Sequence, residues 1–438
     1  MWARLAAWQV LLLVPGVAFW PAIDAAAQGD STDRLGGSSW SPDGQWLAIN
    51  WPERPELFVI SLKSGVSFML RPAGEIQLEV GQVFSAQAPS GQADLRRTTR
   101  VVASPGRDKL TLLEWSPDSA RVAYQAGAGT NALFSVLEGA VKRRMAASDV
   151  LPWHKPDELR VTFELVHPGP DRPTRYSMRV EKLDGTIVRQ IAFEDPREIR
   201  CIGTVRYHDT SFLSANRQFI LYPRVTTNGW QILRESLADG VTAAQPLTKP
   251  SPHEPYQWQL SSDDRFLALV EGDALTIGAL DDWGRAKTIS LPHDSVTVRW
   301  SLDGRFLAFL DGRALYVLAP SLKSGLARDG DQPKLVTENC PQRFWGWRGS
   351  RLYFGDSRTD LTNFSCVDAD HLGPATQVTT KSTRWESATR EVKLSPDGGQ
   401  LACLVVEIDY AGRALWQLWH TAMQTNAEWQ LLYELKPQ

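Results

Sequence analysis

The sequence predicts an all-β protein, a single β-propeller of about eight four-stranded blades, with seven blades as the alternative count. Two observations predict this fold. An apolar residue followed by Ser-Pro-Asp-Gly, or by a close variant, and then by an apolar run recurs along the whole chain. The chain also holds 18 Trp in 438 residues, which suits large flat side chains packed between sheets.

The first 27 residues have the pattern of a signal peptide. Arg4 supplies a positive charge, residues 5–19 are mostly apolar, and Ala25-Ala26-Ala27 supplies the small residues of a cleavage site. The alternative is a retained membrane anchor, but the apolar run is shorter than the roughly 20 residues of a membrane span. We therefore expect a periplasmic or secreted protein that does not span the membrane, with a mature chain from Gln28.

Residues 28–438 are predicted to form the propeller, and the first repeat shows why. In Ser41-Pro42-Asp43-Gly44, proline presets φ at the second position of a type I turn, and Asp and Gly suit the two positions that follow. Apolar, β-rich residues lie on both sides, which indicates a tight hairpin between two buried strands. The residue before each such turn marks one blade, and the eight markers are Trp40, Trp115, Trp153, Leu213, Leu260, Trp300, Trp347 and Leu394.

Most markers are separated by about 40–50 residues, as expected for a propeller blade. A second, Gly-containing turn follows most markers, so each blade is expected to hold four strands, named a to d from the centre outward. The last unit has its own fourth strand near residues 429–435. We therefore expect no strand to be shared between the first and last blades.

The Ser-Pro-Asp-Gly turns followed by Leu-Ala-aromatic runs resemble the WD40-like propeller repeat of the TolB type. The propellers of dipeptidyl-peptidase-type enzymes and of oligogalacturonate lyase have similar repeats. The resemblance covers residues 36–436 and implies the propeller fold. Since one fold hosts many functions, the repeat does not select one.

A long insertion, residues 73–109, interrupts the repeats between the first and second blades. Residues 75–85 and 98–103 are predicted to pair as a hairpin. Loops longer than about 12 residues are uncommon unless they are functional or disordered. The insertion belongs to the d–a connections, which share one face of a propeller with the b–c connections. We expect function on that face, because the a–b and c–d turns read as short, repetitive scaffold.

Arginines recur in the b–c connections, with aspartates and glutamates beside them. A guanidinium offers a planar fork of donors that suits carboxylates. The alternative is that these charges pair with one another in exposed loops and contribute little. The residues predicted to bind a macromolecular partner are Arg175, Arg224, Trp230, Arg313, Arg358, Tyr410 and Arg413.

Three His-acid dipeptides lie in consecutive d–a connections, near the start of strand a. They are His208-Asp209, His253-Glu254 and His293-Asp294. Three imidazoles that converge on the channel mouth would bind a divalent metal. Oligogalacturonate lyase, which this repeat resembles, uses a His-bound metal. The alternative is that blade symmetry merely copies these residues, so we expect no cofactor, with a metal at His208, His253 and His293 as the second hypothesis.

The four cysteines match no zinc spacing. Cys340 and Cys366 flank one repeat and are the best disulfide candidates in an exported chain. The alternative is that all four, including Cys201 and Cys403, are small buried apolar residues.

No Gly-x-Ser-x-Gly elbow, His-Glu-x-x-His pair, phosphate loop or dinucleotide fingerprint is present. The net charge of −3 gives no reason to expect a nucleic-acid partner. The sequence therefore favours a non-enzymatic binding or scaffold protein for a protein or other envelope component. The alternative is a metal-dependent polysaccharide lyase or a sugar-binding propeller with a His-lined channel mouth.

Overall fold

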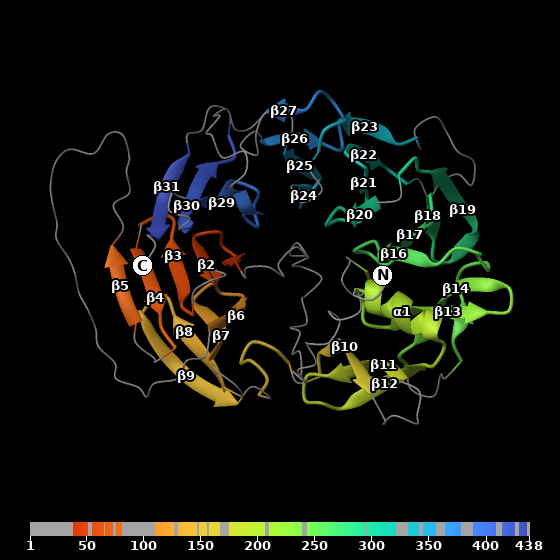
Figure 1. Ribbon diagram of the computed structural model, residues 1–438, viewed down its shortest axis with the longest axis horizontal. Helices are drawn as coiled ribbons and strands as arrows, with labels where there is room; N and C mark the ends of the chain where they lie inside the picture. The colour runs from red at the N-terminus through yellow and green to blue at the C-terminus, as the bar shows by residue number, and fades with distance from the viewer. Residues whose placement is uncertain are drawn as a thin grey trace, which may run out of the picture.

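The computed structural model describes residues 38–50, 55–64, 66–72, 76–80, 110–126, 130–146, 149–155, 157–166, 175–205, 210–238, 243–293, 296–320, 332–340, 345–355, 364–377, 389–408, 414–424 and 429–435. The predicted signal peptide and residues 81–109 of the insertion lie outside these ranges. Eight antiparallel sheets follow one another around a ring (Figure 1). The predicted all-β propeller is confirmed, with eight sheets rather than seven.

The first two blades contain nine strands. The strands are β1 (Ser38–Trp40), β2 (Trp46–Asn50), β3 (Leu57–Ser61), β4 (Val66–Leu70), β5 (Ile76–Val80), β6 (Leu110–Trp115), β7 (Arg121–Ala126), β8 (Thr130–Ser135) and β9 (Ala140–Ala146). β5 is a fifth strand on the first sheet, where Ile76 pairs with Leu70 and Val80 with Val66. Residues 76–80 thus extend the first sheet, while residues 98–103, their predicted hairpin partner, lie outside the described ranges.

The third and fourth blades depart from the four-stranded expectation. Each sheet has three strands, which are β10 (Leu159–Val166), β11 (Arg175–Lys182) and β12 (Ile187–Phe193), then β13 (Phe219–Thr226), β14 (Gly229–Ser236) and β15 (Gln245–Pro246). Residues 151–155 around Trp153 form turns instead of a strand a, and Pro152 there cannot donate to a strand ladder. In the fourth blade strand a is reduced to one bridge, between Leu213 and Ile220.

Helix α1 (Pro196–Val205) follows β12 and was not predicted. Asp195 caps it, since its Oδ1 accepts the backbone N–H of Arg197 at 2.8 Å. Pro196 occupies the first helical position, which proline favours. One face of the helix is buried: Glu198, Cys201, Ile202 and Val205.

The fifth to eighth blades have the predicted four strands each. They are β16 (Pro255–Leu260), β17 (Phe266–Glu271), β18 (Ala274–Ala279) and β19 (Asp282–Ser290); β20 (Val296–Trp300), β21 (Leu307–Asp311), β22 (Ala314–Leu318) and β23 (Lys334–Thr337); β24 (Trp345–Arg348), β25 (Arg351–Gly355), β26 (Phe364–Asp368) and β27 (Thr376–Gln377); and β28 (Thr389–Leu394), β29 (Gln400–Ile408), β30 (Ala414–Ala422) and β31 (Gln430–Leu435). The β22–β23 connection, residues 319–333, is longer than the short c–d turn expected.

The repeated Asp closes the a–b turn by side-chain hydrogen bonds. In the first blade Asp43 Oδ1 lies 2.5 Å from Ser41 Oγ and accepts the backbone N–H of Gln45 at 3.0 Å. Ser41 Oγ also accepts the N–H of Trp46 at 2.9 Å. The same Ser–Asp contact recurs at Ser116–Asp118, Ser261–Asp263, Ser301–Asp303 and Ser395–Asp397. These aspartates are therefore turn formers.

Replacing Asp303 by Ala should lower the free energy of unfolding by about 1 kcal/mol, because Ser301 and the N–H of Arg305 lose their acceptor. Urea unfolding followed by tryptophan fluorescence measures the change. Asp273→Ala, in the exposed turn between β17 and β18, is the control and should leave stability within about 0.5 kcal/mol. Equal stability of both variants would contradict the structural role of Asp303.

Four blade-marking tryptophans hold neighbouring blades in register. Each indole N–H donates to the backbone carbonyl of the residue before the marker of the preceding blade. The pairs are Trp40–Lys393 at 3.3 Å, and Trp115–Ser39, Trp300–Gln259 and Trp347–Arg299 at 3.0 Å. The high tryptophan content thus serves inter-blade packing together with inter-blade hydrogen bonding.

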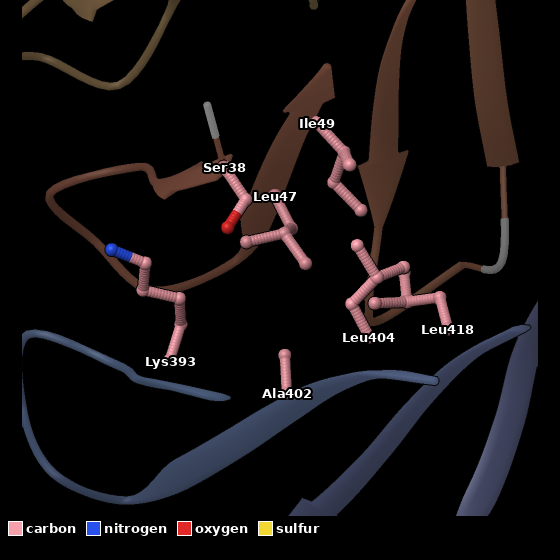
Figure 2. Close-up of a pocket in the computed structure, with 7 residues that line it drawn as sticks. All are labelled: Ser38, Leu47, Ile49, Lys393, Ala402, Leu404 and Leu418. Atoms are coloured by element: carbon pink, nitrogen blue, oxygen red, sulfur yellow. The ribbon is translucent and has the colours of Figure 1, made fainter. Parts of the chain in front are cut away.

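Packing and the Trp40–Lys393 hydrogen bond close the ring. β31 pairs with β30 of its own sheet, so within the described ranges no strand is shared between the first and last blades, as predicted. Trp40, Leu47 and Ile49 of the first blade share one apolar cluster with Leu404 and Leu418 of the eighth. Figure 2 shows a small cavity at this seam, lined by Ser38, Leu47, Ile49, Lys393, Ala402, Leu404 and Leu418.

All four cysteines are free, so the predicted Cys340–Cys366 disulfide is wrong. Cys201, Cys340 and Cys403 are buried in apolar surroundings, and burial raises the pKa of the Cys201 and Cys403 thiols well above the usual value. They behave as small apolar core residues.

Candidate functional site

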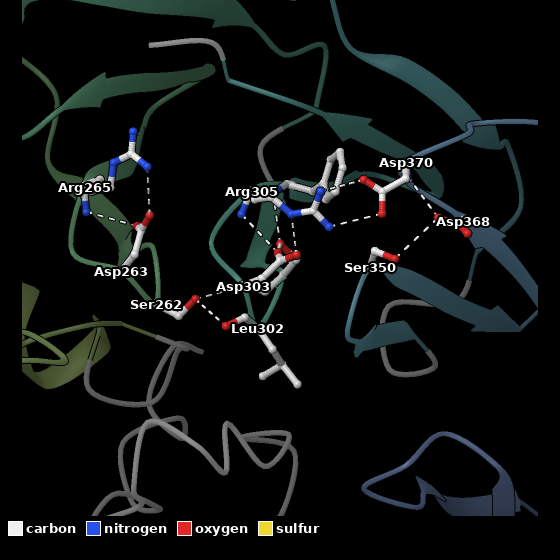
Figure 3. Close-up of polar contacts among 11 residues, drawn as sticks. Ser262, Asp263, Arg265, Leu302, Asp303, Arg305, Ser350, Asp368 and Asp370 are labelled. Atoms are coloured by element: carbon white, nitrogen blue, oxygen red, sulfur yellow. Dashed lines mark hydrogen bonds and ion pairs between the residues drawn. The ribbon is translucent and has the colours of Figure 1, made fainter.

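On the face of the ring formed by the a–b and c–d turns, hydrogen bonds join the turns of neighbouring blades. Ser262 Oγ donates to the carbonyl of Leu302 at 2.7 Å, and Arg305 forms a two-point ion pair with Asp370 (Figure 3). Asp264, in the a–b turn of the fifth blade, accepts the backbone N–H groups of Ala215 and Asn216 in the a–b turn of the fourth blade, each at 2.8 Å. The polar side chains of this face are largely engaged with one another.

The b–c turns and d–a connections share the opposite face, as predicted. His253, in the connection before β16, lies against Gly272 in the β17–β18 turn, and His293 lies in the same way against Gly312 in the β21–β22 turn. A Cβ added to Gly272 or Gly312 would come within 3.2 Å or 3.1 Å of the respective imidazole. Both glycines also have positive φ, of +56° and +63°, so these positions favour glycine.

His293 and Asp311 form a polar contact on this face. Asp311 is only 2% exposed, and its Oδ1 accepts the backbone N–H of His293 at 3.1 Å and lies 3.0 Å from Nδ1 of the ring. The imidazole itself is 59% exposed. The contact therefore holds the d–a connection onto the b–c turn, while much of the His293 imidazole faces solvent.

The fifth blade repeats this arrangement with different chemistry. Glu271 occupies the place of Asp311 at the end of strand b, and burial raises its pKa to about 7, opposed by a hydrogen bond with Ser251. His253 is exposed and packs on Gly272. The fifth and sixth blades share a two-part sequence motif: Pro-His-acid before strand a, and acid-Gly at the end of strand b. The His-acid part was recognised from the sequence, but its pairing with the acid-Gly part was not.

The predicted metal site is not assembled by the residues that the structure describes. His253 and His293 are each held by their own blade, and no group of three His, Cys, Asp or Glu side chains suited to a metal occurs in the described ranges. His208 lies outside them. The described geometry thus gives two separate imidazoles.

Arg224, predicted to bind a partner, is a structural residue. Its Nη1 lies 2.8 Å from Oε2 of Glu198 on α1, and Glu198 is only 4% exposed. Glu198 Oε1 accepts the backbone N–H of Val225 at 2.8 Å, and the guanidinium lies over the ring of Phe193. Because α1 was not predicted, its carboxylate could not be seen as the partner of Arg224.

Trp230, also predicted as an interface anchor, is a buried core residue. Its side chain is 6% exposed and belongs to the core shared by the third, fourth and fifth blades. Its backbone exchanges two hydrogen bonds with Ser251, at 2.7 and 2.8 Å. A buried tryptophan offers no area to a partner.

The remaining predicted binding residues divide into two groups. Arg313 is exposed in the β21–β22 turn, beside Gly312 and His293, and Arg175 begins β11 at the end of a b–c connection. Arg358, Tyr410 and Arg413 lie outside the described residues.

Comparisons with known proteins add little. No protein-family model matches the sequence, and no curated protein matches it. Among solved structures, the chain is similar to apo AztD from Citrobacter koseri (14% identity, 79% of this chain and 86% of that chain, TM-score 0.39). It is also similar to the Cps50 (Swd1) β-propeller domain of Myceliophteria thermophila (12%, 67% and 93%, 0.36) and to TolB from Acinetobacter baumannii (13%, 72% and 77%, 0.31). Likenesses this low do not indicate a function.

No helix in the described ranges is long and apolar enough to cross a membrane.

Proposed function

We propose that this chain is an exported β-propeller that binds a macromolecular partner, a protein or another envelope component, on the face formed by its b–c turns and d–a connections. The asymmetry of the two faces carries this proposal. On the a–b face, charged side chains such as Arg305 pair with neighbouring blades. On the opposite face, His253, His293 and Arg313 are exposed.

The fourth to sixth blades supply the best-described part of this proposed docking face. Arg200 of α1 is 67% exposed and pairs with Glu254 at 2.9 Å, which ties the helix to the connection that carries His253. Buried Asp311 positions His293 through its backbone N–H and its ring. A surface whose polar groups are already positioned loses less conformational freedom on binding. The signal-peptide pattern supports the proposal that the partner is outside the cytoplasm.

Replacing Arg313 by Ala should weaken partner binding about tenfold, since a charge-assisted hydrogen bond contributes roughly 1.5–3 kcal/mol and tenfold corresponds to about 1.4 kcal/mol. Adding Arg175→Ala should weaken it further and reduce its dependence on salt. The measurement is capture of partner from an envelope extract by the immobilised protein across a salt series, followed by affinity for the captured partner.

Arg265→Ala is the matched control, because Arg265 is an exposed arginine on the opposite face, paired with Asp263 at 3.6 Å. Its capture should equal that of the wild type. Loss of binding in Arg265→Ala with full binding in Arg313→Ala would place the partner on the a–b face and contradict the proposal.

A further inference from the structure

Seven of the eight junctions between neighbouring blades share an apolar cluster. One cluster joins the third, fourth and fifth blades, and others join the first to the second, the fifth to the sixth, the sixth to the seventh, the seventh to the eighth, and the eighth to the first. Among the described residues, no cluster contains side chains of both β6–β9 and β10–β12. The cluster on that side of the second blade contains Leu133 and Met145, and the described residues beyond that blade that pack against it are Leu151 and Trp153 of the linking segment.

A polar contact occupies this junction instead. His154 follows the degenerate marker Trp153, and its Nε2 lies 2.6 Å from Oε1 of Glu114, the residue before the marker of the second blade. Its Nδ1 lies 2.8 Å from Oε2 of Glu158. Glu158 belongs to the third blade, since its carbonyl accepts the backbone N–H of Leu183 at 2.9 Å. We call Glu114, His154 and Glu158 the junction latch.

Trp153 contributes to the same contact. Its indole N–H donates to Oε1 of Glu114 at 2.5 Å, whereas the other marker tryptophans donate to a backbone carbonyl of the preceding blade. At the third blade, which lacks strand a, the Glu114 carboxylate thus takes the place of the backbone carbonyl that accepts the indole N–H at other junctions. The inter-blade hydrogen bond is kept, but it now depends on a charged group.

The latch requires a proton on His154. Both ring nitrogens face carboxylate oxygens, which accept but do not donate when ionised, so both nitrogens must donate. The hydrogen bond to Glu114 is the main cause that raises the pKa of His154 to about 9, while burial opposes the rise. The ring is only 14% exposed, so solvent screens the pair weakly.

The other charges around the latch lie at its edges. Arg121 of β7 stacks over the Trp153 ring, with its Cζ 5.6 Å from the centroid. Arg217 lies on the side of the fourth blade, where it donates to the carbonyl of Leu159 and helps to lower the pKa of Glu158. Lys155 and Asp157 are exposed neighbours in the chain. His154 is the group of this set that bridges the two blades.

We propose that the junction between the second and third blades is the place where the ring opens, and that loss of the proton from His154 opens it. An imidazole held by two carboxylates stabilises the junction only while it is charged. Since the apolar contact of the described residues across this junction is limited to Leu151 and Trp153, removing the charge leaves it the weakest of the eight. The pKa of His154 is higher in the closed ring than in the open one, so protonation of His154 stabilises the closed ring. This stabilisation is fully present below about pH 6.5 and is lost as the pH rises through about 9.

Hydrogen exchange with mass spectrometry on the full chain tests the proposal. After correction for intrinsic exchange, the opening constant reported by amides of residues 157–166 should rise on the order of 50-fold from pH 7 to pH 10, given the shift from 6.5 to about 9. Amides of residues 296–311, at the junction of the fifth and sixth blades, should change much less.

His154→Gln should show the open level of exchange already at pH 7 and no pH response. The control is His371→Gln, because His371 is 85% exposed and lies 3.8 Å from Asp368 in the seventh blade. It should behave as the wild type. An equal pH response in wild type and His154→Gln, or opening first at another junction, would overturn the proposal.

NMR of the wild-type protein with ¹⁵N-labelled histidines keeps the test valid if His154→Gln fails to fold. The His154 ring should stay doubly protonated until about pH 9, and Glu114→Gln should shift this transition downward. Titration of His154 in the ordinary histidine range would overturn the proposal.

Discussion

Replacing Trp300 by Ala should destabilise the protein by about 4 kcal/mol, the largest single-residue effect expected here. Trp300 is 1% exposed and lies in the cluster that joins the fifth and sixth blades, where it stacks on Phe266 with ring centroids 5.8 Å apart. The substitution removes this packing and the hydrogen bond to Gln259 together. Urea unfolding monitored by circular dichroism measures the loss.

Two further variants separate these contributions. Trp300→Phe keeps an aromatic ring but loses the N–H donor, so it should cost about 1–2 kcal/mol and leave the Gln259 carbonyl without the indole. Trp283→Ala is the matched control, because Trp283 is only partly buried against a core cluster. If Trp283→Ala cost as much as Trp300→Ala, the marker tryptophans would have no special role in joining blades.

Replacing Arg224 by Ala should destabilise the protein by about 3 kcal/mol, because it leaves the carboxylate of buried Glu198 without its counter-ion. The double variant Glu198→Gln/Arg224→Ala should recover part of this loss, since no unpaired charge remains. Thermal unfolding by differential scanning calorimetry, run on each variant, measures both effects.

Arg313→Ala serves as the control for this comparison. Arg224 lies within strand β13, whereas Arg313 lies in the β21–β22 turn and is exposed, so its loss should change stability by less than about 0.5 kcal/mol. A stability loss in Arg313→Ala equal to that in Arg224→Ala would show that exposure does not distinguish the structural arginine from the proposed binding arginine.

The propeller could be predicted from the sequence because its turns are local. Ser41 and Asp43 close a turn with hydrogen bonds that span at most five residues, so the residues and the structure they form are adjacent in the chain. The same reasoning failed at Trp153, where spacing suggested a marker but Pro152 and the turns around it prevent a strand. A local pattern cannot separate a tryptophan that ends a strand from one that only packs on the preceding blade.

The binding residues were harder to predict because their roles depend on distant partners. Arg224 and Arg313 look alike in sequence, and only α1, which places Glu198 beside Arg224, distinguishes them. The helix itself had a readable signal, Asp195-Pro196 followed by buried residues at helical spacing. The pairing of His293 with Gly312 joins residues from separate strands, and no single repeat unit shows it.

The seam between the first and eighth blades has a consequence for the origin of the ring. Each of these blades is built from one continuous stretch of chain, and the seam between them is joined as several other junctions are, by a shared apolar cluster and a tryptophan-to-carbonyl hydrogen bond. The order of blades around the circle, and not the position of the termini, then specifies the fold. A gene for such a protein can gain a blade by duplication, or be circularly permuted at the boundary between two blades, without splitting any sheet between its two ends.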